Sequence, residues 1–228
     1  MGSGEEVAVH DWKIAEREYL RQVSRRGRRH AFETLEPGRS ALVVIDMIPF
    51  FSEQNPYCRG IIAPINALAS ALRAAGGTVA WVLPSRVDPY PELSQALNGA
   101  EGAEIYRTSA REGPLPGRLC PEVATAEGDL FVEKTAASAF FPGACPLADL
   151  LRARDIETVI IAGTVTNVCC ESSARDARAL GLRVILAADA NAARTDAEHN
   201  AALHTIYRSF GDVRPTAEIL ELIAAAAG

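Results

Sequence analysis

The stretch TVIIAGTVTNVCCESSARDARALGLRVILAADA, residues 158–190, decides the fold of this chain. Residues 158–164 and 183–189 within it are short, continuous apolar runs, a pattern typical of strands that are buried on both faces. Residues 169–180 between them predict a helix, and Gly181 follows it as the kind of residue that commonly ends one. A strand, a helix and a second strand in this order predict two parallel strands joined by a crossover helix.

The same alternation extends over most of the chain. Residues 84–128 are the exception: they are rich in proline, glycine and charge, so we expect long loops with short elements that wall a site. We find no internal repeat and no second core, and the pattern predicts one mostly parallel sheet with helices on both faces. Further strands are predicted at residues 41–47, 78–83 and 129–135 and near Val213, and further helices at 64–75, 146–154, 195–209 and 216–226.

The residues ahead of the first strand are interpreted as an N-terminal arm. Residues 1–12 are expected to form a flexible lead-in, and residues 13–29, with seven Lys and Arg side chains, a helix. That segment also holds Glu16 and Glu18, and the whole chain has a net charge of −6, so a solvated helix or a subunit-contact arm is favoured over a nucleic-acid arm. The division that follows is an N-terminal arm and helix at residues 1–36 and one domain at residues 37–228.

The composition narrows the class of protein. The chain has 228 residues, 48% of them hydrophobic, which is enough for a sizeable core. Its 29 Asp and Glu against 23 Lys and Arg create no overall field that attracts nucleic acid or an anionic membrane. No apolar run approaches the roughly 20 residues that span a bilayer, and the first residues lack the pattern of a signal peptide. We therefore expect a cytoplasmic protein that binds neither nucleic acid nor membrane.

The cysteines and histidines indicate neither disulfides nor a metal site. The five cysteines fit no disulfide framework, and thiols stay free in a reducing compartment. The four histidines are scattered, and the chain contains no Cys-x-x-Cys pair. We expect no metal and no cofactor, and we interpret Cys58, Cys120 and Cys145 as structural.

Three reactive side chains follow the predicted strands. Asp46 ends the first strand, Lys134 ends the third, and the turn after the fourth brings Cys169 to the start of a helix. Each alone has an ordinary explanation, as a cap, a solvated lysine or a small buried hydrophobe. Ligands of open α/β sheets bind at the carboxyl ends of the strands, so the joint placement of the three indicates one reactive site.

The chemistry expected of this trio is nucleophilic attack by a thiol. A free thiol has a pKa near ~8.5, and a helix N-terminus and a nearby cation such as Lys134 are expected to lower it for Cys169. Asp46 is suited to take the thiol proton and later give it to a leaving amine. The backbone N–H groups of the turn are candidates to hold the oxyanion of a tetrahedral intermediate.

Three motifs resemble those of the isochorismatase-like cysteine hydrolases. They are LVVIDM with Asp46, VEKTAASAF with Lys134, and GTVTNVCCESSARDARALGLRVILAADA around Cys169, within a resemblance that covers roughly residues 40–215. The resemblance implies a three-layer α/β/α Rossmann-like sandwich and an Asp46–Lys134–Cys169 triad that cleaves a C–N amide bond through a thioester. It also implies a cis peptide at Thr164–Val165 and an oxyanion hole made of the N–H groups of Val165 and Cys169.

The alignment with the family's motifs, and the positions that differ from them, narrow the range of expected activities. The nucleophile is the first of two adjacent cysteines, so Cys170 is interpreted as a packed core thiol. Many relatives have a glutamine where this chain has Ile48. The loop PSRVDPYPELS, residues 84–94, lacks the histidines that hold a metal in nicotinamidases of the family. Cys169 in turn disfavours the vinyl-ether chemistry of those members that lack the cysteine.

Several substrates and roles remain open. The block around Cys169 resembles a subgroup of the family that opens a lactam in streptothricin antibiotics, and an acidic protein suits a cationic antibiotic, so the leading expectation is such a lactam, hence antibiotic resistance. The segment EREYLRQVSRRGRRHAFETL resembles ureidoacrylate-type members of the family, which implies as the alternative a linear amide of the ureidoacrylate or carbamoyl type in nitrogen catabolism. A non-catalytic binding protein and a thiol sensor using Cys169 and Cys170 are the remaining hypotheses. The resemblance also implies a homodimer or homotetramer, and the candidate substrate-binding residues are Phe50, Trp81, Phe141 and Asn167, with Phe140 beside them.

Overall fold

The computed structural model describes residues 7–226 and contains one six-stranded sheet. All neighbouring strands are parallel, in the order β3-β2-β1-β4-β5-β6. The predicted parallel sheet is thereby confirmed. The strands are β1 (Ser40–Ile45), β2 (Thr78–Pro84), β3 (Leu130–Lys134), β4 (Thr158–Thr164), β5 (Arg183–Ala192) and β6 (Asp212–Arg214).

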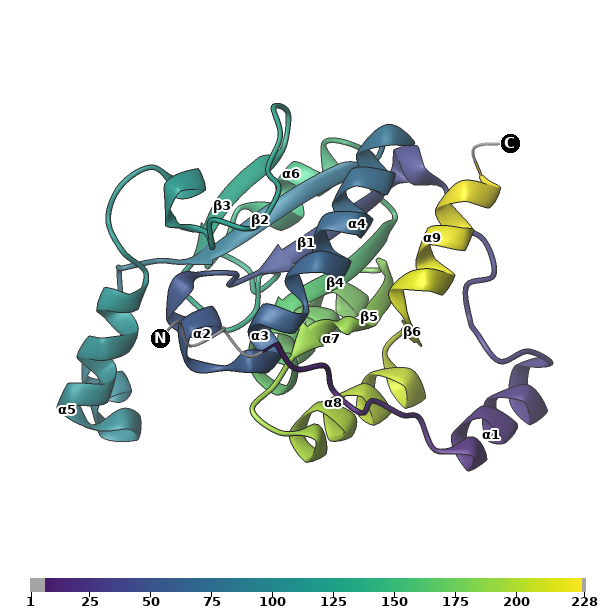
Figure 1. Ribbon diagram of the computed structural model, residues 1–228, viewed down its shortest axis with the longest axis horizontal. Coiled ribbons are helices and arrows are strands. Elements are labelled where there is room, and N and C mark those ends of the chain that lie inside the picture. The colour runs from purple at the N-terminus through teal and green to yellow at the C-terminus, as the bar shows by residue number, and fades with distance from the viewer. Residues whose placement is uncertain (1–6, 227–228) are drawn as a thin grey trace, which may run out of the picture.

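Helices cover both faces of the sheet and make the predicted three layers (Figure 1). Helices α4 (Ile62–Ala74) and α9 (Thr216–Ala225) pack on one face, and α6 (Leu147–Arg152), α7 (Glu171–Ala179) and α8 (Asp196–Ser209) on the other. Along β1 the side chains alternate between the two cores: Leu42 and Val44 face α4 and α9, whereas Val43 and Ile45 face the other layer. Burial on both faces explains why these strands are continuous apolar runs.

The sheet has its switch point between β1 and β4. From β1 the chain proceeds to β2 and β3 on one side, then returns to β4 and proceeds outward on the other, which leaves a crevice at the carboxyl ends of β1 and β4. Gly163 near the end of β4 lets the two strands approach closely there. Its φ is 116°, and a Cβ at this position would lie 2.1 Å from the carbonyl oxygen of Ile45.

The region after β2 differs from the prediction of long loops. It contains α5 (Pro91–Ser109), a helix bent at Gly99, where φ is 73°. No residue of α5 is buried, and Figure 1 shows the helix at the periphery, beyond α2 (Pro49–Gln54). A helix without a buried face needs no apolar stripe, so periodicity did not reveal it.

The N-terminal residues pack on the domain instead of forming the expected lead-in. Residues 1–6 of that predicted lead-in lie outside the described part of the chain, whereas His10 and Ile14 are buried. Helix α1 (Glu16–Arg26) follows and buries Tyr19. Behind it, the buried carboxylate of Asp212 accepts hydrogen bonds from the N–H groups of Ala31 and Phe32, at 2.7 and 2.9 Å. These partners are distant in sequence, so local composition could not indicate them.

The remaining short elements connect the layers. They are α3 (Pro56–Gly60), the 3₁₀ turns Pro37–Arg39 and Leu115–Arg118, and the wide turn Thr166–Cys170. Helix α8 begins with the predicted capping box, in which Thr195 and Glu198 each accept a hydrogen bond from the other's backbone. Within residues 7–226, no helix combines the length and apolar character needed to cross a bilayer.

Candidate active site

Three strands bring the predicted trio together at the switch point. Asp46 follows β1, Lys134 is the last residue of β3, and Cys169 lies in the turn Thr166–Cys170 after β4. Because β2 separates β3 from β1, the Lys134 backbone is two strand spacings, roughly 10 Å, from β1. A long side chain is therefore needed at this position to reach Asp46.

The side chains of the trio are in direct contact. The Nζ of Lys134 lies 2.9 Å from Oδ2 of Asp46 and 3.5 Å from Sγ of Cys169. It also donates to the carbonyl oxygen of Ala136 at 3.2 Å. Lys134 and Asp46 are buried and Cys169 is half-buried, so the ion pair is shielded while the thiol remains reachable. The sequence prediction that these residues converge is confirmed, and their catalytic roles remain predictions.

The backbone of Asp46 is held in an unusual conformation. Its φ of 52° lies in the left-handed region, which is costly for a residue other than glycine. Its N–H donates to the carbonyl oxygen of Val82 at 2.8 Å, and its own carbonyl oxygen accepts from the hydroxyl of Thr164 at 2.9 Å. Among the described residues, Oδ1 of the carboxylate has no hydrogen-bond partner, so one oxygen is available to accept a proton.

The pKa of Cys169 corrects the expectation of a lowered value. Burial, and then the Asp46 carboxylate, raise the pKa of this thiol to about 12, and Lys134 lowers it by less. For Lys134, burial lowers the pKa but the Asp46 carboxylate and Cys169 raise it by more, so the net change is upward. The reason is that Asp46 already neutralises Lys134. The free site therefore contains a protonated thiol beside an ammonium–carboxylate pair.

The turn that carries the nucleophile has the implied geometry. The Thr164–Val165 peptide is cis, as the resemblance implies. The carbonyl oxygen of Val165 accepts from the N–H groups of Val168 and Cys170, at 3.0 and 3.3 Å. These two donors are occupied within the turn, and the assignment of the oxyanion hole to the N–H groups of Val165 and Cys169 remains a prediction.

The adjacent cysteine is not accessible. Cys170 is fully buried in the core between the sheet and α7, and burial raises its pKa well above the ordinary value. Cys58 and Cys120 are buried as well, Cys145 is half-buried, and all five thiols are free. Cys169 is thus the nucleophile candidate of the pair, in agreement with the family register.

The candidate substrate-binding residues have different surroundings. The prediction that Trp81 binds substrate is wrong. The side chain is fully buried in the core below α4, and its Nε1 donates to Asp129 at 2.7 Å. It is central in β2, where a large apolar side chain fills the core and does not wall a pocket. Phe50 is half-buried against Phe51 of α2 and Tyr106 of α5.

The other two candidates are exposed near the nucleophile. Asn167 is exposed in the turn before Cys169, and Phe141 is 55% exposed, whereas the neighbouring Phe140 is buried. Phe141 lines a shallow hollow of about 320 Å³, whose lining includes Ala136, the carbonyl partner of Lys134, but no member of the trio. The sequence analysis missed Ser172, which also lines it; its position one helical turn beyond Cys169 was the available signal. The full lining is Ala136, Ala137, Ser138, Phe141, Ser172, Arg175 and Asp176.

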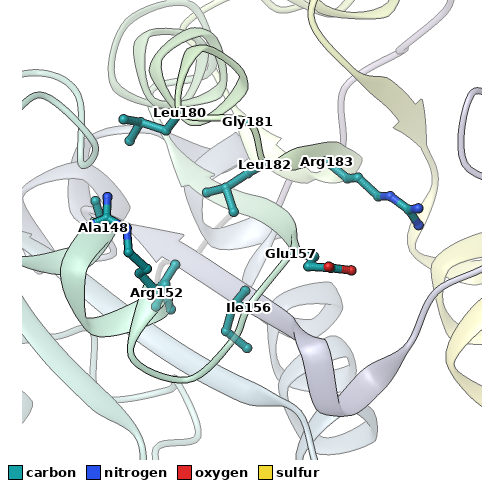
Figure 2. Close-up of a pocket in the computed structure, with 9 residues that line it drawn as sticks. Ala148, Arg152, Ile156, Glu157, Leu180, Gly181, Leu182 and Arg183 are labelled. Carbon is teal, nitrogen blue, oxygen red and sulfur yellow. The ribbon is translucent and has the colours of Figure 1, made fainter.

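A second hollow, of about 370 Å³, lies at the opposite end of the strands (Figure 2). It is lined by Glu157, which precedes β4, and by Arg183, which begins β5. The seven residues of β4 separate it from the trio by roughly 20 Å. In Figure 2 the Arg183 guanidinium points away from the hollow, and it lies over the ring of Phe32. This hollow is therefore separate from the trio.

In residues 7–226, no three His, Cys, Asp or Glu side chains are arranged to hold a metal ion. Absence of a metal requirement remains a prediction, which chelation tests.

A reachable thiol beside a buried pair of a carboxylate and an ammonium group is suited to nucleophilic attack on a carbonyl carbon, with the carboxylate as the candidate base. Residues 40–218 match the isochorismatase domain, and the chain belongs to the isochorismatase family. The resemblance read from the three motifs is confirmed, and the protein is an amidohydrolase that acts on C–N bonds other than peptide bonds.

Three known proteins illustrate the relationship. Ureidoacrylate amidohydrolase RutB of Enterobacter sp. (strain 638) is 30% identical, over 84% of this chain and 92% of its own. Maleamate amidohydrolase of Pseudomonas putida KT2440 is 29% identical, over 83% and 89%. The crystal structure of a cysteine hydrolase from Pseudomonas syringae pv. phaseolicola 1448A superposes with a TM-score of 0.71 at 29% identity, over 86% of this chain and 98% of that chain.

Proposed function

We propose that this protein hydrolyses a small, linear amide or ureido acid by nucleophilic attack of Cys169. The observation that carries the proposal is the contact of Lys134 with both Asp46 and Cys169, at 2.9 and 3.5 Å. The fold alone requires no such cluster, and a non-catalytic binding protein or a thiol sensor has no use for the buried ion pair.

The protonated thiol defines the first step. Asp46 accepts the thiol proton as Sγ of Cys169 attacks the carbonyl carbon, because the raised pKa leaves little free thiolate. Lys134 remains charged and stabilises the sulfur as it loses its proton. The N–H groups of Val165 and Cys169 hold the oxyanion of the tetrahedral intermediate.

The second half returns the site to its starting state. Asp46 gives its proton to the leaving nitrogen, the C–N bond breaks, and an amine or ammonia departs from a Cys169 thioester. A water molecule then gives a proton to Asp46 and attacks the thioester carbonyl. The C–S bond breaks, the acid is released, and the proton returns from Asp46 to Cys169. All atoms and protons are accounted for without a cofactor.

The linear substrate class is supported by the relatives. Ureidoacrylate and maleamate, the substrates in their names, are acyclic molecules that join an amide or ureido group to a short unsaturated acid. The named relatives provide no support for a lactam, so a streptothricin-type substrate and antibiotic resistance are not the leading assignment. A hollow of about 320 Å³, lined by Phe141, by Ser172 and by Ala136, whose carbonyl oxygen accepts a hydrogen bond from Lys134, has room for a small acyclic molecule.

The test is release of ammonia or amine from a panel of amides. Ureidoacrylate, maleamate, N-carbamoylsarcosine, nicotinamide, biuret and a streptothricin are incubated with wild type and Cys169→Ser, with and without chelator. Turnover of a linear acid, lost in Cys169→Ser and insensitive to chelator, is the expected result. Turnover of the streptothricin alone would assign the lactam, and turnover of none would leave a binding protein.

Location and assembly belong to the same proposal. We expect a cytoplasmic enzyme that forms a homodimer or homotetramer, with α1 as a plausible contact arm because Leu20 and Val23 are exposed on it. Sedimentation of wild type and of a variant lacking residues 1–30 measures this. An unchanged assembly state in the shortened protein would remove α1 from the interface.

A further inference from the structure

A stack of three rings, two of them buried and that of Tyr57 half-buried, lies behind the nucleophile turn, outside the catalytic trio. The ring of His10 is sandwiched between Tyr57 of α3 and His199 of α8, with centroid distances of 3.8 and 4.2 Å and planes within 9° of parallel. His10 is 7% exposed and His199 is fully buried. Three distant segments of the chain thus meet in one polar cluster inside the protein.

The partners of His10 determine its tautomer. The backbone N–H of Ala193 donates to Nε2 at 3.0 Å, and since an amide N–H can only donate, Nε2 carries no proton. The proton is therefore on Nδ1, which donates to Oδ1 of Asp196 at 2.6 Å. The hydrogen bond from His10 lowers the pKa of the Asp196 carboxyl and so keeps it ionised as the acceptor. The ring is neutral and held at both nitrogens in one orientation.

His199 connects the His10 ring to the turn that carries Cys169. Its Nδ1 shares a hydrogen bond of 2.9 Å with the hydroxyl of Thr166, and both residues are fully buried. Burial, and then the neighbouring His10, lower the pKa of His199 to about 3, so its ring is neutral at ordinary pH. Thr166 lies between Val165 and Cys169, whose N–H groups are the candidate oxyanion donors.

The N-terminal segment is anchored where it passes these residues. The N–H of Ala8 donates to the carbonyl oxygen of Pro56 at 3.2 Å. Further on, Lys13 N–H donates to Oδ1 of Asn200, whose Nδ2 donates to the carbonyl oxygen of Asp11, at 2.7 and 2.9 Å. Figure 1 shows the segment running from beside α3 past α8 to α1.

Gly60 at the end of α3 accommodates this path. A Cβ there would lie 1.9 Å from the carbonyl oxygen of Ala8, so the segment and the helix meet in backbone contact. Such close packing holds residues 7–14 as a fixed wall of the domain.

We infer that residues 7–14 belong to the catalytic apparatus, with His10, His199 and Thr166 as positioning residues for the Cys169 turn. The inference rests on the proposed amide hydrolysis. His10 fixes the plane of His199, His199 fixes the Thr166 hydroxyl, and Thr166 fixes the backbone between the two oxyanion donors. A displacement of about 1 Å at a reacting centre can cost about a hundredfold in rate, so a loosened turn lowers kcat while substrate binding changes little.

Matched pairs of variants isolate the hydrogen bonds. Thr166→Val removes the hydroxyl at constant shape, and Thr166→Ser restores it. His199→Leu removes the Nδ1 contact, and His199→Asn keeps an amide at that position. His10→Phe keeps the ring stack and removes both of its hydrogen bonds. Turnover is expressed per folded active site, with the folded fraction measured by circular dichroism, so unfolded molecules do not contribute.

We expect kcat per site to fall about tenfold to a hundredfold in Thr166→Val and His199→Leu, with KM within about twofold of wild type. Thr166→Ser and His199→Asn should recover most of the loss, and His10→Phe should show a smaller fall in kcat alone. A purely structural role would lower the melting temperature and the folded fraction, with kcat per folded site unchanged.

Unchanged kcat per site in Thr166→Val and His199→Leu would overturn the inference. Unchanged kcat per site in His10→Phe would overturn the claim that residues 7–14 belong to the catalytic apparatus. Wild-type turnover tests the proposed function independently. Should wild type hydrolyse no amide, the rate constant of Cys169 alkylation replaces kcat. A rate constant altered in Thr166→Val and restored in Thr166→Ser then supports the inference, and equal rate constants overturn it.

Discussion

The protonation of Cys169 decides how the reaction begins. Burial and Asp46 raise the pKa of the thiol to about 12, so a preformed thiolate is a minor species at neutral pH. The site therefore differs from cysteine sites in which an imidazolium or an unpaired cation keeps the thiol ionised. Here the cation is already paired with a carboxylate, and in the proposed mechanism that carboxylate is the base.

Replacement of Asp46 by asparagine separates thiol reactivity from catalysis. Asp46→Asn removes the negative charge that raises the pKa of Cys169 and leaves Lys134 unpaired, so the thiol pKa falls. We expect alkylation of Cys169 by iodoacetamide at pH 8 to become about tenfold faster or more, while amide turnover falls to the level of Cys169→Ser.

The control for this experiment is Cys169→Ser, which reports alkylation of the other four thiols. Slower alkylation in Asp46→Asn, in protein that remains folded by circular dichroism, would contradict the assigned cause of the raised pKa.

At the scale of elements, the close approach of β1 and β4 builds the site. The two strands pair from Ser40 with Thr158 to Ile45 with Gly163, and they are followed by Asp46 and by the turn that carries Cys169. Any side chain at position 163 would push the strands apart where Asp46 and the nucleophile turn begin.

Gly163→Ala and Gly181→Ala form a matched test of that approach. Both glycines have positive φ, 116° and 91°, but only the new Cβ at 163 meets a backbone atom within 4 Å. We expect Gly181→Ala to lower the free energy of unfolding by roughly 1–2 kcal/mol, from backbone strain alone. Gly163→Ala should cost about 3 kcal/mol or more and reduce turnover. Equal costs in urea unfolding would contradict this account.

Helix α5 contributes little to stability because it buries no side chain. Leu97 on α5 is 75% exposed, whereas Leu72 on α4 is fully buried. We expect Leu97→Ala to change the free energy of unfolding by less than about 0.5 kcal/mol, and Leu72→Ala to lower it by roughly 2–5 kcal/mol. Chemical denaturation of both variants measures the difference. A loss above about 1 kcal/mol in Leu97→Ala would show that α5 packs against the body.

At the scale of the whole molecule, the buried His199 and the half-buried His30 link folding to pH. Burial, and then nearby cations, lower the pKa of His30 to about 4, and burial lowers that of His199 to about 3. In the unfolded chain both titrate near ~6.5. The folded state binds fewer protons, so its stability is full above about pH 6.5 and is lost as the pH falls toward the folded pKa values.

We expect the free energy of unfolding to fall by about 4 kcal/mol between pH 7 and pH 5, roughly 2 kcal/mol from each histidine. This is a large part of the 5–15 kcal/mol typical of a domain. Urea unfolding at the two pH values is compared for wild type, His30→Gln and His199→Gln. Each variant should lose about half of the pH dependence, and an unchanged dependence in both would refute the linkage.

The amino-acid sequence by itself determined the layers and the site. Continuous apolar runs report burial on both faces, and strand–helix alternation allows one parallel sheet, which puts Asp46, Lys134 and the Cys169 turn at the same edge. Local pattern is sufficient here because it encodes which faces are buried and in what order the elements follow.

Only the tertiary structure decided the state and the surroundings of that site. The raised pKa of Cys169 depends on burial and on a carboxylate from another strand. Trp81 is a core residue because α4 covers it, and periodicity did not predict α5 because no residue of that helix is buried. His10 obtains its role from Ala193 and Asp196 at the far end of the chain. The desolvation of a side chain and its hydrogen-bond or ion-pair partners depend on neighbours in space, and periodicity along the chain does not indicate which residues those neighbours are.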